Sequence, residues 1–251
     1  MRLDKLVAEL TGKTRTQATQ VLRAGRISVN GTVIRDGAFH VKEEEDTVSL
    51  DDKVLTFSRF AYFMLNKPAG VVSATKDRAD ATVVALLSSE DRKKRALFPV
   101  GRLDKDTEGL LLITDDGMLS HQLTSPRKHA DKLYFAKLKR EITKEDIEEF
   151  AKGMQVDEEL TALPALLRVL TKEEANGFAP DGEPCAAVVL QEGKFHQVKR
   201  MFAATGNEVL FLKRMAMGGV SLDPVLLPGQ YRPLTEEEIK ALRTWGNQLE
   251  C

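Results

Sequence analysis

Apolar residues at helical spacing open the chain and predict two short helices. The first is expected to end at Gly12, because its apolar positions recur three or four residues apart at Leu3, Leu6, Val7 and Leu10. A second helix is expected to begin after Thr14, since Thr14 and Gln17 have the spacing of a capping box. Gly25 is expected to end this second helix.

Alternating apolar residues then predict a β-hairpin. Ile27, Val29 and Val33 alternate around the pair Asn30-Gly31, which tolerates the positive φ of a type I′ turn. Residues 1–57 are therefore expected to fold as a small separate domain of two helices and a hairpin. The polar residues 58–61 are expected to link it to the rest of the chain.

The pattern that follows predicts a larger domain over residues 62–240 and a C-terminal tail over 241–251. Residues 62–72 combine a strand, a Pro/Gly turn and a second strand. Further strands are expected at 110–114, 133–138, 166–170, 186–190 and 208–212, and helices at 82–88, 117–123, 143–152, 196–205 and 235–243. Because this alternation lacks βαβ spacing, it favours an α+β fold with a mainly antiparallel mixed sheet flanked by helices.

Composition is that of an ordinary globular protein. Hydrophobic residues make up 42% and charged residues 30% of 251 residues, which excludes a fully disordered chain. Two cysteines, Cys185 and Cys251, cannot form a disulfide framework, and no Cys/His cluster suggests a metal. The N-terminus lacks a signal-like apolar segment and no apolar run could cross a bilayer, so we expect a cytoplasmic protein without a membrane partner.

The charge is uneven along the chain. The whole sequence has a net charge of -1, which argues against a uniformly basic coat, but residues 1–40 hold seven basic and three acidic residues. Solvated helix faces would account for such a surplus, and so would a surface that binds phosphates. The helix-helix-hairpin order, with Arg15 opening the second helix and Arg26 entering the hairpin, resembles the S4 RNA-binding domain. On this basis Arg2, Arg15 and Arg26 are candidate RNA contacts.

The most unusual segment is the polar loop 101–109, which enters an apolar strand. Asp104, Asp106 and Glu108 match part of an EF-hand loop, but Phe98-Pro99 cannot belong to the entering helix and a Leu occupies a ligand position. Asp104 and Asp106 could also be the paired carboxylates of a glycoside hydrolase, although residues two apart on a strand point to opposite faces.

A third interpretation rests on resemblance. Gly101-Arg102-Leu103-Asp104 resembles the catalytic motif of pseudouridine synthases, in the form found in the branch that carries an S4 domain and modifies ribosomal RNA. Other segments resemble family signatures in the expected order, over roughly residues 1–240. They are Asn66-Lys67-Pro68, Thr124-Ser125-Pro126-Arg127, Lys132 to Tyr134, residues 192–201 and residues 228–235.

The resemblance implies roles for individual residues. Asp104 would be the nucleophile, and Tyr134 would stack on the target base and move its proton. A buried carboxylate stays ionised when a cation lies nearby, and Lys199 matches the family position for that cation, with Arg200 as the alternative. Arg102 would fill the space left by a flipped uridine or hold flanking phosphates. Lys132 and Arg200 are further candidates for RNA or base contacts, and His196 is expected only to form hydrogen bonds.

The reaction that the resemblance implies needs no cofactor and no metal. The implied target is a single uridine of small-subunit (16S) ribosomal RNA, uridine-516, presented by free RNA or by an assembling 30S particle to a monomeric enzyme. A related activity on large-subunit (23S) RNA and a noncatalytic S4-type RNA-binding or ribosome-assembly factor remain alternatives. An intact set of Asp104, Tyr134 and Lys199 argues against the noncatalytic factor.

Overall fold

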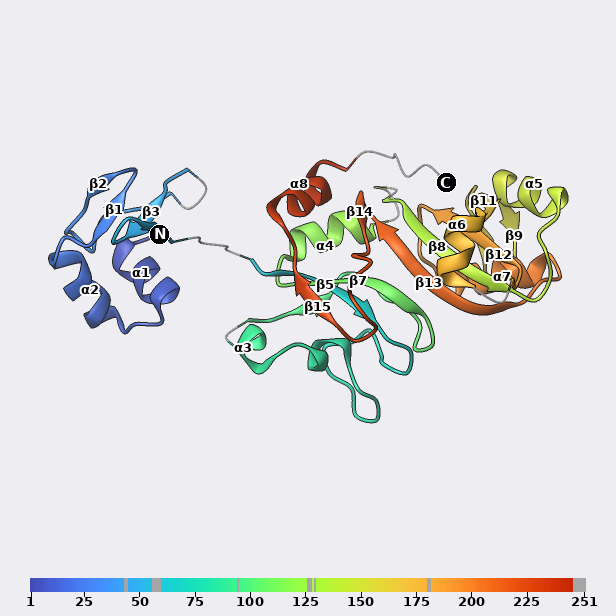
Figure 1. The fold of residues 1–251 in the computed structure, drawn as a ribbon, viewed down its shortest axis with the longest axis horizontal. Coiled ribbons are helices and arrows are strands. Elements are labelled where there is room, and N and C mark those ends of the chain that lie inside the picture. The colour runs from blue at the N-terminus through green and yellow to red at the C-terminus, as the bar shows by residue number, and fades with distance from the viewer. Residues whose placement is uncertain are drawn as a thin grey trace. The chain divides into compact units, whose positions relative to one another are not determined.

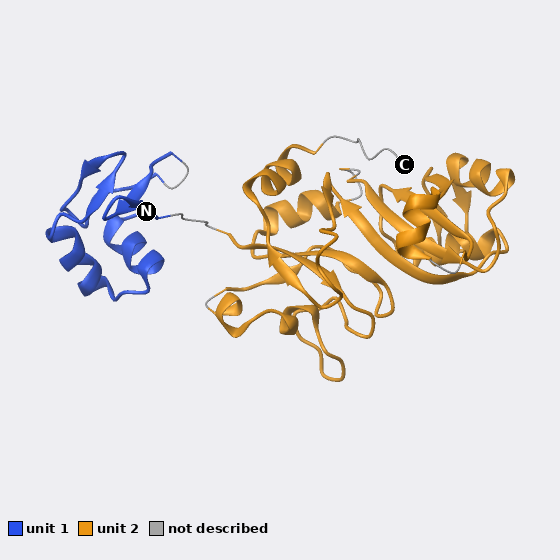
Figure 2. Cartoon of the chain, in the orientation of Figure 1, with its two compact units in different colours: residues 1–59 blue, residues 60–251 orange. Residues whose placement is uncertain are grey.

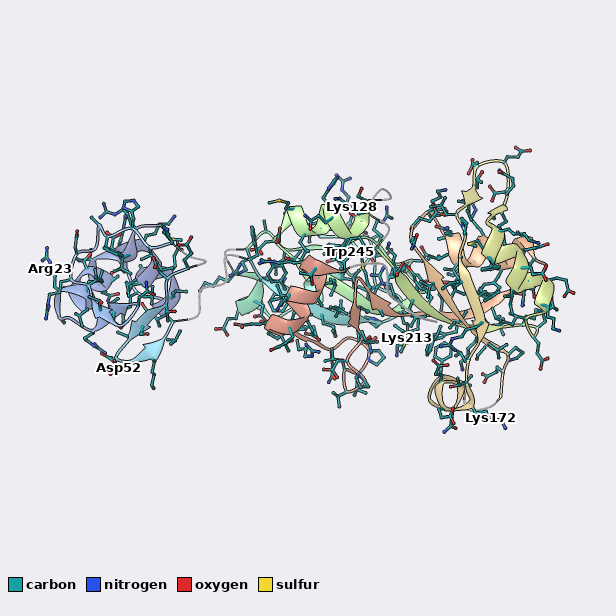
Figure 3. All side chains as sticks on the ribbon, turned by 90° about the horizontal axis from the view of Figure 1, so that it is seen from above. Arg23, Asp52, Lys128, Lys172, Lys213 and Trp245 are labelled. Atoms are coloured by element: carbon teal, nitrogen blue, oxygen red, sulfur yellow. The ribbon has the colours of Figure 1, made fainter. Side chains whose placement is uncertain are left out.

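The computed structural model describes residues 1–42, 45–55, 60–93, 95–125, 128, 130–179 and 182–245. Contacts divide the chain into two compact units, residues 1–59 and residues 60–251 (Figure 2). Most charged side chains lie on the outside of the two units, as Arg23 and Lys172 illustrate (Figure 3), whereas a few, among them Lys67 and Arg214, are buried. None of the helices in the described ranges has the length and apolar character needed to cross a bilayer.

The first unit contains the predicted helices and hairpin. Thr14 caps the second helix with a complete capping box, and the hairpin turns at Asn30 and Gly31, whose φ angles are 50° and 78°. Two short strands that the sequence analysis did not identify extend the sheet to the order β2-β1-β3-β4. The elements are α1 (Leu3–Thr11), α2 (Arg15–Arg23), β1 (Ile27–Val29), β2 (Thr32–Val33), β3 (Val48–Leu50) and β4 (Lys53–Val54).

The second unit is built on a long mixed sheet with the strand order β11-β12-β8-β13-β7-β5-β15 (Figure 1). Only the β7–β13 pair in this order is parallel among the described strands, so the expectation of a mainly antiparallel sheet is confirmed. The strands of this sheet are β5 (Tyr62–Lys67), β6 (Phe98–Pro99), β7 (Glu108–Thr114), β8 (Lys132–Leu138), β11 (Leu166–Val169), β12 (Cys185–Leu190), β13 (Val209–Met217), β14 (Val220–Ser221) and β15 (Tyr231–Pro233), and β9 (Met154–Gln155) and β10 (Thr161–Ala162) form a separate two-stranded sheet.

Helices cover both faces of this sheet. Leu111 and Ile113 of β7 pack into one core with α5 and α7, whereas Leu110 and Leu112 pack into a second core with α4 and α8. Burial on both faces explains why β7 is a continuous apolar run. The helices are η1 (Val83–Leu86, a 3₁₀ helix), α3 (Ser89–Arg92), α4 (Gly117–Thr124), α5 (Lys144–Lys152), α6 (Lys172–Phe178), α7 (Gln197–Ala204) and α8 (Glu236–Thr244).

Two predicted boundaries need correction. The strand expected at 208–212 continues to Met217. The prediction ended too early because Arg214, a charged residue that is buried in this strand, interrupts the apolar pattern. The domain expected to end at residue 240 continues through α8, whose Leu242 is buried in the second core. The part of the expected tail that lies beyond Trp245 is outside the described residues.

Candidate active site

The side chain of buried Lys67 is hydrogen-bonded to the backbone of the polar loop between β6 and β7. Its ammonium group donates hydrogen bonds to the carbonyl oxygens of Pro68 at 3.0 Å, Lys105 at 3.3 Å and Thr107 at 2.8 Å. Burial lowers the pKa of Lys67 to about 8, so it remains a cation at neutral pH. All three N–H donors are used on backbone oxygens, and the loop around Asp104 is therefore fixed at its far end.

The turn after β5 holds the near end of the same loop. Ser73 accepts a hydrogen bond from the Leu103 amide at 3.0 Å and donates one to the Leu103 carbonyl at 2.8 Å. The amide of Gly70 donates to the Lys105 carbonyl at 2.7 Å. The residues on both sides of Asp104 are thus bonded to the segment that follows β5, which gives its carboxylate a defined position.

Gly109 permits the parallel contact between β7 and β13. It pairs with Arg214 and has a φ of 101°, which L-residues with a side chain rarely adopt. A Cβ atom at this position would lie 2.3 Å from the Arg214 carbonyl oxygen. The glycine therefore brings the end of the Asp104 loop against β13.

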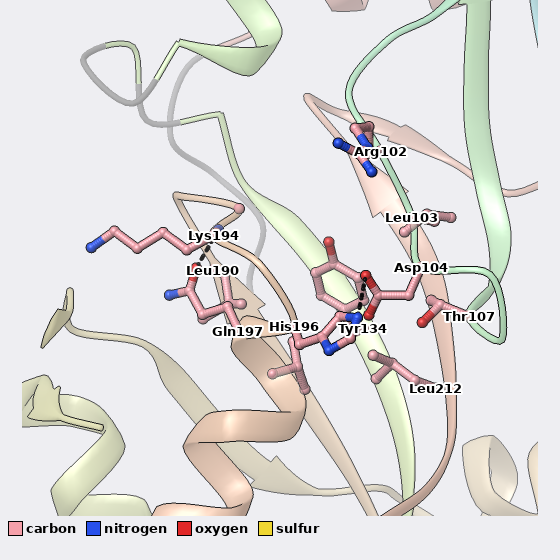
Figure 4. A pocket seen from close by; sticks show the side chains of 12 residues that line it. Arg102, Leu103, Asp104, Thr107, Tyr134, Leu190, Lys194, His196, Gln197 and Leu212 are labelled. Atoms are coloured by element: carbon pink, nitrogen blue, oxygen red, sulfur yellow. Dashed lines mark hydrogen bonds and ion pairs between the residues drawn. The ribbon is translucent and has the colours of Figure 1, made fainter. Parts of the chain in front are cut away.

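The Asp104 carboxylate lies beside two nitrogen groups of the segment 196–199. Its Oδ2 is 3.8 Å from Nζ of Lys199, and its Oδ1 is 3.6 Å from Nε2 of His196. The side chain is 25% exposed and lines a cavity of about 50 Å³ (Figure 4). The other lining residues are Arg102, Leu103, Thr107, Tyr134, Leu190, Gly193, Lys194, His196, Gln197, Val198 and Leu212.

Lys199 is shared between two carboxylates. Its ammonium group binds both oxygens of Asp106, at 2.6 and 2.7 Å, more closely than it approaches Asp104. Hydrogen bonding to Lys199 lowers the pKa of Asp106. Asp106, which the sequence analysis treats as one of two candidate glycosidase carboxylates, is in fact 73% exposed and paired with this lysine.

Arg200 faces away from Asp104. Its guanidinium pairs with Asp157, with Nε 2.8 Å from the nearer carboxylate oxygen, and lies 3.9 Å from Glu159. The alternative in which Arg200 pairs with Asp104 is therefore wrong for this structure, because Lys199 and Arg200 project from different sides of α7. Lys199 is the nearer cation.

Tyr134 and Arg102 line the same cavity as Asp104. Tyr134 is buried on β8, and its ring lies next to Asp104 in the cavity (Figure 4). Within the described residues its hydroxyl has no hydrogen-bond partner, which leaves it available to a substrate. Arg102 is exposed at the edge of the cavity and Lys194 lies on the opposite wall.

The role of His196 is only partly visible in the sequence. It begins α7 in the left-handed region, with a φ of 50°, and stacks on exposed Phe195 at a ring separation of 3.8 Å. Its Nε2 lies 3.6 Å from Oδ1 of Asp104, which is longer than a hydrogen bond, and its expected role in hydrogen bonding, for which the sequence names no partner, stays a prediction. Its position three residues before Lys199, on the same helical face, is the signal that places it near the carboxylate.

The arginines expected to contact RNA in the first unit each have an acidic partner. Arg2 and Arg15 bind Asp4, with closest distances of 2.8 and 3.2 Å, and Arg26 binds Asp51. The hydrogen bond from Arg2 lowers the pKa of Asp4 to about 2. About half of each guanidinium side chain remains exposed, so each keeps donors that face solvent.

The described residues hold no group of three His, Cys, Asp or Glu side chains arranged to bind a metal. Pro126 and Arg127, which belong to one of the expected signatures, lie outside the described residues. What the site offers is a fixed carboxylate beside a lysine, a buried tyrosine and an arginine at the entrance. This set suits nucleophilic attack by the carboxylate on a planar substrate.

Known proteins share both units. Residues 61–204 match the family described as RNA pseudouridylate synthase, and residues 1–48 match the S4 domain. An uncharacterized RNA pseudouridine synthase of Bacillus subtilis is 43% identical, covering 96% of this chain and 98% of its own length. Ribosomal small subunit pseudouridine synthase A of Escherichia coli is 42% identical, covering 96% of this chain and all of its own. A crystal structure of a pseudouridylate synthase has 38% identity and a TM-score of 0.65, covering 96% and 99% of the two chains.

Proposed function

This chain belongs to the RNA pseudouridine synthases and converts uridine in RNA to pseudouridine, and from that premise we propose that Asp104 is the nucleophile and a uridine of small-subunit ribosomal RNA is the target. The observation that carries the proposal is the position of Asp104. The backbone of its loop is held by Lys67 and Ser73, and its carboxylate lines the same cavity as Tyr134 and lies 3.8 Å from Lys199.

The reaction breaks the bond between N1 of uracil and C1′ of ribose and joins C1′ to C5. Asp104 forms a transient covalent bond, to C1′ or to the uracil ring, and is released when the new bond forms. The proton on C5 is then lost and the freed N1 gains one, so substrate and product are isomers and no oxidant, reductant or water is consumed. Lys199 places a positive charge 3.8 Å from the Asp104 carboxylate.

Tyr134 and Arg102 act on the base and on the RNA. The Tyr134 ring stacks on the uracil, and its hydroxyl, which has no hydrogen-bond partner among the described residues, is available to move the C5 proton. A uridine in folded RNA must leave its stack to reach Asp104, and Arg102 at the entrance fills the vacated space or holds the adjacent phosphates.

The proposed substrate is uridine-516 of 16S ribosomal RNA, in free RNA or in an assembling 30S particle, and the proposed enzyme is a monomer. The name and near-complete coverage of the Escherichia coli relative support this target. We assign RNA binding to residues 1–57, a linker to 58–61 and the chemistry to the domain that begins at residue 62.

The test is a map of pseudouridines in ribosomal RNA from cells with and without this gene. One small-subunit site should disappear without the gene and return when the gene is restored. Loss of a large-subunit site would assign the related 23S activity instead. An unchanged map, with no pseudouridine formed by purified protein on extracted RNA, would favour a noncatalytic S4-type factor.

A further inference from the structure

A second cavity of about 130 Å³ adjoins the catalytic one. The two cavities are contiguous, because Arg102, Tyr134, Gly193 and Lys194 line both. Two basic side chains that are almost completely buried, Lys132 and Arg214, line the second cavity. Arg214 plays no part in the roles assigned above.

The sheet places Lys132 and Arg214 side by side. Tyr134 and Arg214 are directly paired between β8 and β13, and Lys132 precedes Tyr134 by two positions on the same strand. Residues two apart on a strand share a face, as do directly opposed residues of antiparallel strands. Both cations and the catalytic tyrosine therefore project from one face of the sheet.

Neither cation has an acidic partner among the residues that the structure describes. The Lys132 ammonium donates one hydrogen bond, to the Ala130 carbonyl at 2.7 Å. Nε of Arg214 donates to the Leu110 carbonyl at 2.8 Å, and its buried Nη2 has no partner in the described part of the chain.

The carboxylate on the cavity wall is engaged elsewhere. Glu192 is buried and binds Lys194 at 3.1 Å, and it also accepts hydrogen bonds from the Leu163 amide and the Gln197 side chain. Two adjacent buried cations without an ion-pair partner repel one another and have lost their hydration. Burial and the charge of Arg214 lower the pKa of Lys132 to about 8, so at neutral pH it remains charged.

We propose that Lys132 and Arg214 bind the phosphodiester group next to the target uridine. A phosphodiester carries one negative charge on two free oxygens, which matches the unused donors of a guanidinium and an ammonium group. A neutral uracil carbonyl would satisfy hydrogen bonds without compensating the charge. The inference rests on the proposed function, since it takes the ligand to be the RNA strand that enters the Asp104 cavity.

The subsite positions the substrate. A phosphate held by Lys132 and Arg214 fixes the backbone of a flipped nucleotide beside Tyr134, and this limits where the uracil can lie relative to Asp104. Both residues are positioning residues, because they bind the backbone and do not touch the reacting atoms.

The test neutralises one phosphate at a time. The RNA probe is a short fragment carrying the uridine that wild-type protein modifies, with a methylphosphonate at the linkage on its 5′ or 3′ side. A 2′-deoxy nucleotide precedes that linkage in neutral and native probes alike, so that the strand is stable. One of the two neutral linkages should weaken wild-type binding about tenfold, the loss expected for a charged hydrogen bond.

Lys132→Met, of similar length and without charge, provides the coupled measurement. This substitution should weaken binding of the native probe by a similar factor. The affinity of the variant should be the same for the native probe and for the methylphosphonate probe that weakens wild-type binding. Lys139→Met is the control, because Lys139 is 70% exposed and pairs with Glu208. This control should retain the full methylphosphonate effect.

Two results would overturn the subsite. One is that neither methylphosphonate changes the affinity of the wild-type protein, a result that does not depend on whether any variant folds. The other is a methylphosphonate effect of equal size in wild type and Lys132→Met. Failure of the proposed function is recognised separately, because wild-type protein would then form no pseudouridine in the native ribosomal RNA.

Discussion

Tyr134 has a buried ring and a hydroxyl group without a partner in the described structure, so its two functions can be separated by substitution. Tyr134→Phe keeps the ring that stacks on the base and removes only the hydroxyl. If the hydroxyl moves a proton, this variant should bind RNA normally and turn over about 10² to 10⁴ times more slowly. Tyr134→Leu should also bind more weakly. Single-turnover rates and binding measured together test this, and wild-type turnover by Tyr134→Phe would restrict the residue to stacking.

Lys132 links function to stability. Its pKa is about 8 in the folded protein against 10.5 for an ordinary lysine, mainly because of burial, with Arg214 adding to the effect and Asp131 and Glu192 opposing it. Below pH 8 the folded and unfolded states are both protonated, and the buried charge costs on the order of 3 kcal/mol. Between pH 8 and 10.5 the folded state releases the proton first, and wild type therefore gains stability.

The corresponding prediction compares wild type with Lys132→Met. At pH 7 the variant should be at least as stable as wild type, and its advantage should shrink as the pH rises from 8 to 10. Urea unfolding of both proteins across this range measures the difference in their free energies of unfolding. Lys67 also titrates in this range, but it is present in both proteins and its contribution cancels in the difference. A difference that does not depend on pH would contradict the account.

At the level of secondary structure, the parallel β7–β13 pair aligns the catalytic loop with β13, and Gly109 makes this pairing possible. Gly109→Ala would place a methyl group 2.3 Å from a backbone oxygen that cannot rotate away. We expect a loss of about 3 kcal/mol or more in unfolding free energy, together with loss of activity. Gly70→Ala is the matched control, because Gly70 also has positive φ but open space at Cβ, and it should cost about 1 kcal/mol. Equal urea midpoints for the two variants would disprove the contact argument.

Local patterns predicted most elements but not the contacts between them. The β7 strand was predictable because its apolar run fills two cores, and α2 because its capping box is a local signal. The end of β13 was not, since Arg214 is a charged residue inside a buried strand. Lys67 holds carbonyls 38 and 40 positions away, and the choice between Lys199 and Arg200 depends on the rotation of α7. Such contacts follow from tertiary packing and have no local signature.

At the scale of the whole molecule, the proposed function assigns RNA binding to the first unit, whose basic surplus lies in residues 1–40, and the chemistry to the second unit. Arg26 and Asp51 form an exposed ion pair, which contributes at most about 1 kcal/mol and can be shared with a phosphate. Arg15 pairs with buried Asp4, but its own side chain is 58% exposed and keeps donors that face solvent. Replacing both arginines with Gln should weaken binding to 16S ribosomal RNA. It should also reduce the salt dependence by about 0.7 to 0.9 log unit for each lost phosphate contact.

Affinity measured over a range of salt concentrations tests this division. The single-turnover rate at saturating protein should stay near that of wild type, because neither arginine belongs to the catalytic unit. Lys152→Gln, a change of one exposed charge in the catalytic unit, is the control. Binding unchanged at every salt concentration would remove these arginines from the RNA-binding surface.

The most direct measurement is pseudouridine formation by Asp104→Asn in a single-turnover assay on small-subunit ribosomal RNA. Asn preserves the size of the side chain and removes its charge and nucleophilicity, so the folded variant should bind RNA and form no pseudouridine. Asp106→Asn is the matched control, because its loss leaves Lys199 free beside Asp104, and most activity should remain. Appreciable pseudouridine from Asp104→Asn, or equal inactivation of folded Asp106→Asn, would contradict the assignment of Asp104 as the nucleophile.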